Sequence, residues 1–139
     1  MKSSLLLRVA SVLTLIFCAG HTYGALHVSS SDPEQAAVFM AMQAFPFSIM
    51  GARRTHWDFY RGFSLLFSVT LLLLAVLLWQ LAGLAKSNPV GARPFIGSLF
   101  LAYLGFTILS GVYFFMAPAL FSAAVAVCLA LAFTSARTG

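Results

Sequence analysis

The longest uncharged interval constrains this chain more than any other feature. No Asp, Glu, Lys or Arg occurs from Pro94 to Ala136. As a helix rising about 1.5 Å per residue, the interval would be on the order of 65 Å long, about twice the hydrocarbon thickness of a bilayer. Pro118 lies near its middle and disfavours helical geometry in the residue before it. The interval therefore predicts two membrane crossings, at residues 95–115 and 118–136.

Two further apolar stretches predict two further crossings. Residues 62–85 lie between Arg61 and Lys86 and include the run LLLLAVLLW. Residues 5–26 form another stretch if Arg8 extends its charged end to the interface, as long basic side chains do. Each stretch has the roughly 20 residues that a crossing needs. We therefore expect an all-α fold, a four-helix transmembrane bundle that makes residues 1–139 one integral membrane domain.

Composition excludes the main alternatives. The chain is 61% hydrophobic and 8% charged, whereas about a quarter of the residues in a soluble domain are charged. The same apolar content excludes intrinsic disorder. The net charge of +5 comes from scattered basic residues, and nucleic-acid binding needs a clustered patch, so we expect no nucleic-acid partner. The two cysteines lie in apolar runs without a CxxC pattern, which predicts neither a disulfide nor thiol chemistry.

The first stretch has two interpretations. Its basic start, apolar middle and small residues Cys18, Ala19 and Gly20 are typical of a cleaved secretory signal. However, the apolar pattern continues to Leu26 and is long enough to span a membrane. We expect the segment to be retained as a helix, and an intact-mass measurement distinguishes the two.

The distribution of basic residues predicts the orientation, because short loops rich in Lys and Arg stay in the cytoplasm. With both termini inside, five basic residues are cytoplasmic and three are outside. The cytoplasmic set is Lys2, Arg8, Lys86, Arg93 and Arg137, and the outer set is Arg53, Arg54 and Arg61. Both termini are therefore predicted to lie in the cytoplasm.

The outer loop, residues 27–56, contains a predicted short amphipathic helix. Asp32 is a typical N-cap, with Pro33 at the first helical position and Gln35 three residues after the cap. Apolar residues then recur at three- and four-residue spacing: Val38, Phe39, Met42 and Phe45. Such a helix is expected to lie at the membrane surface, as a spacer or as a lid, and we favour the spacer.

Small residues predict the packing faces of the last two helices, because they let helix backbones approach in lipid. One predicted face is Ser98, Ala102 and Gly105, and the other is Ala119, Ala123, Ala126 and Ala130. The alanine face also makes a homo-oligomer possible.

The polar residues on the outer side form the candidate site. The candidate ligand-binding residues are His21, Tyr23, Asp58, Tyr60 and Arg61. Asp58 and Arg61 are three residues apart and can pair on one helix face. Ionisable groups near hydrocarbon are costly unless they are paired or face a polar cavity, which makes them candidate site residues. We expect His21, Asp58 and Arg61 to converge beneath the two tyrosines.

Two other interpretations of these residues stay open. Aromatic and charged side chains also collect at membrane interfaces. In the structural interpretation, which we slightly favour, Asp58 and Arg61 form only an anchoring ion pair and His21 is hydrogen-bonded to a neighbouring helix. A metal site of His21, His27, His56 and Asp58 is less favoured, because no HxxxH or HxxE spacing places two ligands on one face. We therefore predict no metal, no cofactor and no catalytic residue.

The segments GHTYG and WDFYRGF and the four-helix hydropathy pattern resemble the small bacterial inner-membrane proteins grouped as DoxX-like. The resemblance covers the whole chain in layout. It implies a role with a quinone or a partner protein in a respiratory or thiol redox system. The chain has no CxxC and no haem-ligand pair to match that role, so no catalytic residue is carried over.

The expected function is that of a non-catalytic multi-pass membrane protein that binds a small apolar ligand or lipid, or acts as an accessory subunit. Membrane lipid, a lipophilic small molecule and a second copy of the chain are the expected partners. The alternative is a small membrane enzyme, an isomerase or oxidoreductase, acting on a lipophilic substrate such as a quinone. His21 would then carry the proton and Asp58 would orient it.

Overall fold

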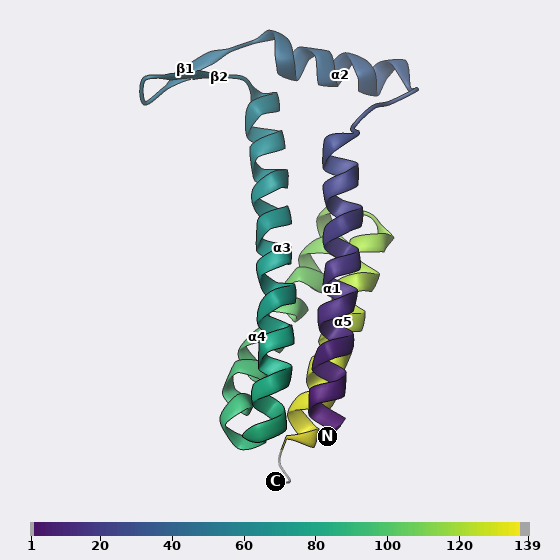
Figure 1. The fold of residues 1–139 in the computed structure, drawn as a ribbon. Helices are drawn as coiled ribbons and strands as arrows, with labels where there is room; N and C mark the ends of the chain where they lie inside the picture. Colours follow the sequence, from purple (N-terminus) through teal and green to yellow (C-terminus); the bar gives the residue numbers. More distant parts are fainter. Residues whose placement is uncertain (1, 137–139) are drawn as a thin grey trace. The chain divides into compact units, whose positions relative to one another are not determined.

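The computed structural model describes residues 2–136, which form five helices and one hairpin (Figure 1). In chain order these are α1 (Lys2–Leu26), α2 (Pro33–Ala44), β1 (Phe47–Ile49), β2 (Ala52–Arg54), α3 (His56–Ser87), α4 (Pro89–Tyr113) and α5 (Met116–Ser135). Helices α1, α3, α4 and α5 are long and apolar enough to cross a membrane, which confirms the four predicted helical spans at that level. Arg137, one of the basic residues on the predicted cytoplasmic side, lies outside the described residues.

The chain divides into two compact units. Unit 1 combines residues 1–18 with residues 71–139, and unit 2 is residues 19–70. Unit 1 therefore holds the first part of α1, the second part of α3, and all of α4 and α5. Unit 2 holds the last turns of α1, then α2, the hairpin and the first turns of α3.

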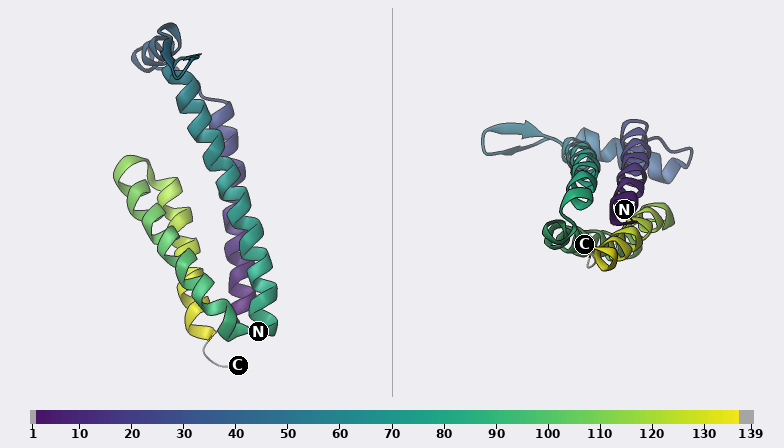
Figure 2. Two further views of the ribbon diagram at one scale, coloured as in Figure 1. Left: turned by 90° about the vertical axis from the view of Figure 1, so that its left-hand side faces the viewer. Right: turned by 60° about the horizontal axis from the view of Figure 1, so that its bottom comes forward.

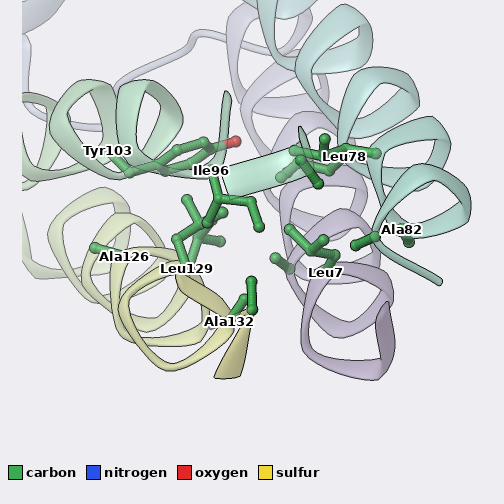
Figure 3. Close-up of a cluster of buried hydrophobic side chains, with 14 residues drawn as sticks. Leu7, Leu78, Ala82, Ile96, Tyr103, Ala126, Leu129 and Ala132 are labelled. Carbon is green, nitrogen blue, oxygen red and sulfur yellow. The ribbon is translucent and has the colours of Figure 1, made fainter. Parts of the chain in front are cut away.

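Apolar side chains from all four helices form the core of unit 1 (Figure 3). Helices α4 and α5 run side by side in opposite directions (Figure 2). The largest side chains of the cluster are fully buried: Tyr103, Leu7, Leu78, Ile96 and Leu129. Many other Leu, Val and Phe side chains on the same helices are exposed, as expected where lipid is the solvent.

Two serine hydroxyls fix how α1 lies against α3 within unit 1. Ser4 donates to the carbonyl oxygen of Ala82 at 2.7 Å, and Ser11 donates to that of Ala75 at 2.6 Å. The contacts lie seven residues apart on both helices, with the numbering running in opposite directions, so this part of the pair is antiparallel and in one register. All four hydrogen-bonding residues are buried or nearly so.

Helix α4 begins earlier than predicted, at Pro89 rather than Phe95. The Asn88 side chain caps it by accepting from the Gly91 N–H at 2.9 Å, and Pro89 fits the first helical position because its missing N–H has no helical partner there. The charge of Arg93 was expected to stay outside the helix. Instead, its guanidinium carbon lies 4.3 Å from the ring centroid of Phe133 on α5, a cation–π contact that offsets its partial burial.

The break between the last two helices also differs from the prediction. Helix α4 ends at Tyr113 and α5 begins at Met116, so the turn precedes Pro118 by more than one residue. Pro118 is the third residue of α5, where its absent N–H costs no helical hydrogen bond. Pro118 therefore lies within the first turn of α5 instead of separating the two helices.

The predicted small-residue faces are only partly correct. On α4, Ser98 and Ala102 are exposed, and the buried face carries Tyr103 instead. On α5, Ala126 is buried while the other three alanines are half-buried or at the edge of the buried face. The buried face of α5 combines small and larger residues: Ser122, Val125, Ala126, Leu129 and Ala132. Packing in unit 1 therefore depends on one tyrosine filling space as well as on close backbone approach.

The hairpin in unit 2 was not predicted. Strands β1 and β2 pair antiparallel, with Phe47 opposite Arg54 and Ile49 opposite Ala52. The turn residues Met50 and Gly51 have φ of 49° and 83°, which is the pattern of a type I′ turn. Asn or Asp is the usual first residue of that turn. Because Met50 occupies this position, the sequence does not show the usual pattern of a hairpin turn.

Candidate functional site

His21 joins α1 to α3 within unit 2. Its Nε2 lies 3.0 Å from the carbonyl oxygen of Ser64, and because a carbonyl only accepts, Nε2 carries the proton and donates. The imidazole also meets the Phe67 ring edge-on, with ring centroids 5.0 Å apart. The side chain is half-buried. These contacts hold the imidazole against a neighbouring helix.

The two candidate tyrosines have separate aromatic partners. Tyr23 is 67% exposed and stacks on His27 with centroids 4.3 Å apart. Tyr60 stacks on Trp57 with centroids 5.4 Å apart, and Trp57 contacts Phe39 of α2. The second pair therefore ties α2 to the start of α3, and the first pair remains at the end of α1.

Asp58 caps α3. Its carboxylate accepts from the backbone N–H of Thr55 at 2.8 Å and from the Thr55 hydroxyl at 3.0 Å. In return, the Asp58 N–H donates to the Thr55 hydroxyl oxygen at 3.1 Å. This reciprocal arrangement is a capping box. It explains why α3 begins at His56 rather than at the apolar residue 62.

Arg61 does not pair with Asp58 as expected. Within the described residues, no ion pair joins them, and the Arg61 side chain is exposed. The Asp58 carboxylate already faces back toward the helix start, where the capping hydrogen bonds hold it.

The five candidate residues therefore lie in one unit. The contacts described for His21, Tyr23, Asp58 and Tyr60 are to residues outside the candidate set. The alternative metal site has no support in the geometry. Among residues 2–136, no group of three or more His, Cys, Asp or Glu side chains is placed to hold a metal ion.

Helix α2 lies across the neighbouring ends of α1 and α3 in unit 2 (Figure 1). Asp32 is its N-cap and accepts from the Glu34 N–H at 3.0 Å. The Asp32 N–H donates to the Ser30 hydroxyl oxygen, which takes the place that Gln35 was expected to fill. Val38 and Phe45 of the predicted apolar face are exposed, and no residue of α2 is buried.

Sequence reasoning missed a groove at the start of α3. It has a volume of about 260 Å³ and is lined by Arg54, Asp58, Phe59, Gly62, Phe63 and Leu66. Asp58 is the only one of the five candidates among these lining residues. A Cβ atom at Gly62 would have no neighbour within 4 Å, so the missing side chain leaves the hollow open. The three-, four- and seven-residue spacing of residues 59, 62, 63 and 66 is the signal that could have revealed it.

The groove has a polar end and an apolar end. Arg54, at the end of β2, and Asp58 provide the charges, while the phenylalanines and Leu66 continue along α3 into its apolar run. Phe63 is 66% exposed and Leu66 is 64% exposed. An amphiphilic molecule with a polar head and an apolar chain matches this order of side chains.

No family model, curated protein or solved structure matches the chain.

Proposed function

We propose that the chain is a non-catalytic, multi-pass protein of the bacterial inner membrane that binds a lipid or another small amphiphile along the start of α3. The groove around Gly62 carries this proposal, because charged residues end it and apolar residues continue it toward the membrane. The polar head lies between Arg54 and Asp58. The apolar chain lies over Gly62 and against Leu66.

The length of α3 supports this placement. Its 32 residues span about 48 Å, which exceeds the roughly 30 Å hydrocarbon core. The first turns of α3 therefore extend to the interface, where aromatic side chains such as Trp57 and Tyr60 are favourable. The groove then opens at the level of lipid headgroups on the outer side.

The test is substitution of Gly62 by Leu, which fills the groove. Because Gly62 has open space around its Cβ position, the variant is expected to fold normally and to lose co-purifying lipid or ligand. Native mass spectrometry of the full chain in mild detergent measures the bound species. Gly83→Leu is the matched control, since Gly83 is an open glycine on the same helix and outside the groove. Equal ligand retention in both variants would contradict the proposal.

The same measurement addresses the enzyme alternative. A co-purifying quinone would favour an isomerase or oxidoreductase and the redox role that the DoxX-like resemblance implies. His21 would then be the residue to test, because it is the proposed proton carrier. Its Nε2 proton is engaged by the Ser64 carbonyl, so a catalytic role would require that hydrogen bond to open.

A further inference from the structure

Unit 1 contains a second hollow, on the helix pair of α1 and α3. It has a volume of about 180 Å³ and is lined by Ser4, Leu5, Arg8 and Lys86. Two basic side chains from different helices thus face one small space. The Ser4 hydroxyl donates to the carbonyl oxygen of Ala82. This hydrogen bond holds the backbones of α1 and α3 together beside the hollow.

The helix geometry explains why these two cations converge. In an α-helix, each Cα–Cβ bond tilts toward the N-terminus. Arg8 therefore leans toward the beginning of α1, and Lys86 leans away from the end of α3. Because these segments are antiparallel in the register fixed by Ser4 and Ser11, both side chains approach the level of Ser4 from opposite directions.

A cation–π contact also fixes the position of the Arg8 guanidinium on α3. Its central carbon lies 5.2 Å from the centroid of the Trp79 ring, within the range of a cation–π contact. Trp79 is 52% exposed and lies seven residues before Lys86 on the same face of α3. Tryptophan is favoured at the membrane interface, so this ring is suited to the boundary between headgroups and acyl chains.

No acidic side chain in unit 1 neutralises these cations. All three acidic residues of the chain, Asp32, Glu34 and Asp58, belong to unit 2. Arg8 and Lys86 are both exposed, and Leu5 beside them is 65% exposed. The hollow therefore combines two uncompensated positive charges with adjoining apolar surface.

We propose that this hollow binds the phosphate headgroup of an anionic phospholipid, with its acyl chains against Leu5 and the neighbouring exposed face of α1. Basic pockets between membrane helices recognise anionic headgroups in this way. The site lies in unit 1 and is independent of the groove at Gly62 in unit 2.

The experiment compares phosphatidylglycerol with phosphatidylcholine of the same acyl chains. Both lipids are given in equal amounts to the delipidated full-length protein, and native mass spectrometry measures the ratio of bound lipids. We expect phosphatidylglycerol to be favoured at least about five-fold, since one Lys or Arg near a membrane surface contributes about that factor. A ratio near one for the unmodified protein would overturn the proposal.

Substitutions test whether Arg8 and Lys86 cause the preference for phosphatidylglycerol. Arg8→Gln and Lys86→Gln are each expected to lower the ratio, and together to bring it close to one. Lys86→Arg keeps the charge and should keep the ratio. Arg93→Gln is the matched control, because Arg93 is a cation of unit 1 that lies over Phe133 instead. An unchanged ratio in the double variant, or an equal loss in Arg93→Gln, would overturn the proposal.

Two further arms distinguish this lipid site from a site for free anions and from the groove at Gly62. Inorganic phosphate at the lipid concentration should not displace phosphatidylglycerol, because it lacks acyl chains. Complete displacement would show a site for free anions and would contradict the lipid assignment. Gly62→Leu should not lower the ratio, whereas it should lower the total amount of bound lipid. Failure of the groove at α3 and failure of this site therefore give different results.

Discussion

At the scale of single residues, one buried hydroxyl pair connects α1 and α4 in unit 1. The Thr14 and Tyr103 hydroxyl oxygens lie 2.7 Å apart, and Thr14 donates to the Ala10 carbonyl at 2.9 Å. A threonine hydroxyl has one proton to donate, so Tyr103 is the donor to Thr14. Both side chains are fully buried, where an unmade hydrogen bond is costly.

Replacing Tyr103 by Phe should therefore destabilise the protein. The variant keeps the ring and removes the donor, and we expect a loss of about 1 kcal/mol in the free energy of unfolding. Thermal unfolding in detergent measures it. Tyr113→Phe is the control, because Tyr113 is 74% exposed, and an equal loss in both variants would rule out a specific role for the buried hydroxyl pair.

Ser122 should behave in the opposite way. Its hydroxyl is fully buried and has no hydrogen-bond partner among the described residues, so Ser122→Ala removes an unsatisfied polar atom with little change in volume. We expect unchanged or higher thermal stability. Ser11→Ala is the comparison, because it breaks the hydrogen bond to Ala75 and should lower stability. A clear loss in Ser122→Ala would mean that the hydroxyl has a partner.

At the scale of secondary-structure elements, the start of α3 depends on the capping box of Thr55 and Asp58. Asp58→Ala removes the acceptor of two hydrogen bonds, and we expect the first turn of α3 to fray at a cost of about 1 kcal/mol. Hydrogen exchange of the amides of residues 56–60 should become faster. Arg61→Gln, in contrast, should leave this exchange unchanged. Faster exchange in both variants would instead favour the ion pair that the sequence suggested.

The four long helices could be predicted because long uncharged runs have few other possible structures. Their ends could not, because single side chains decide them: Asn88 starts α4 early, and Thr55 starts α3 early. The candidate site was predicted as a set of residue types on one side of the membrane. Their partners depend on local geometry, and the capping contact of Asp58 competes with a pair to Arg61 that has the same sequence spacing.

At the scale of the whole molecule, charge is divided unevenly along the chain. The acidic residues all lie within residues 19–70, and the other segments carry only basic ones. Basic residues near membrane helices favour the cytoplasmic side. Five of the eight basic residues lie outside residues 19–70, and the prediction that both chain ends are cytoplasmic rests on this bias.

A fusion experiment tests that orientation. A fluorescent reporter that matures only in the cytoplasm, fused after Gly139, should be bright, and an alkaline phosphatase fused there should be inactive. Insertion of the phosphatase after Gly51, in the turn between β1 and β2, is the control and should be active. Phosphatase activity at the C-terminal fusion would show that the C-terminus lies outside the cytoplasm and would contradict the predicted orientation.

The shared register of α1 and α3 limits how the two helices can change in length. Their serine contacts recur after seven residues on each helix, which is close to two full helical turns. Inserting one residue between Ser4 and Ser11 would rotate one hydroxyl by about 100° and displace it by about 1.5 Å relative to the other. Insertions or deletions here are therefore tolerated only when α3 changes by the same number of residues at the matching level.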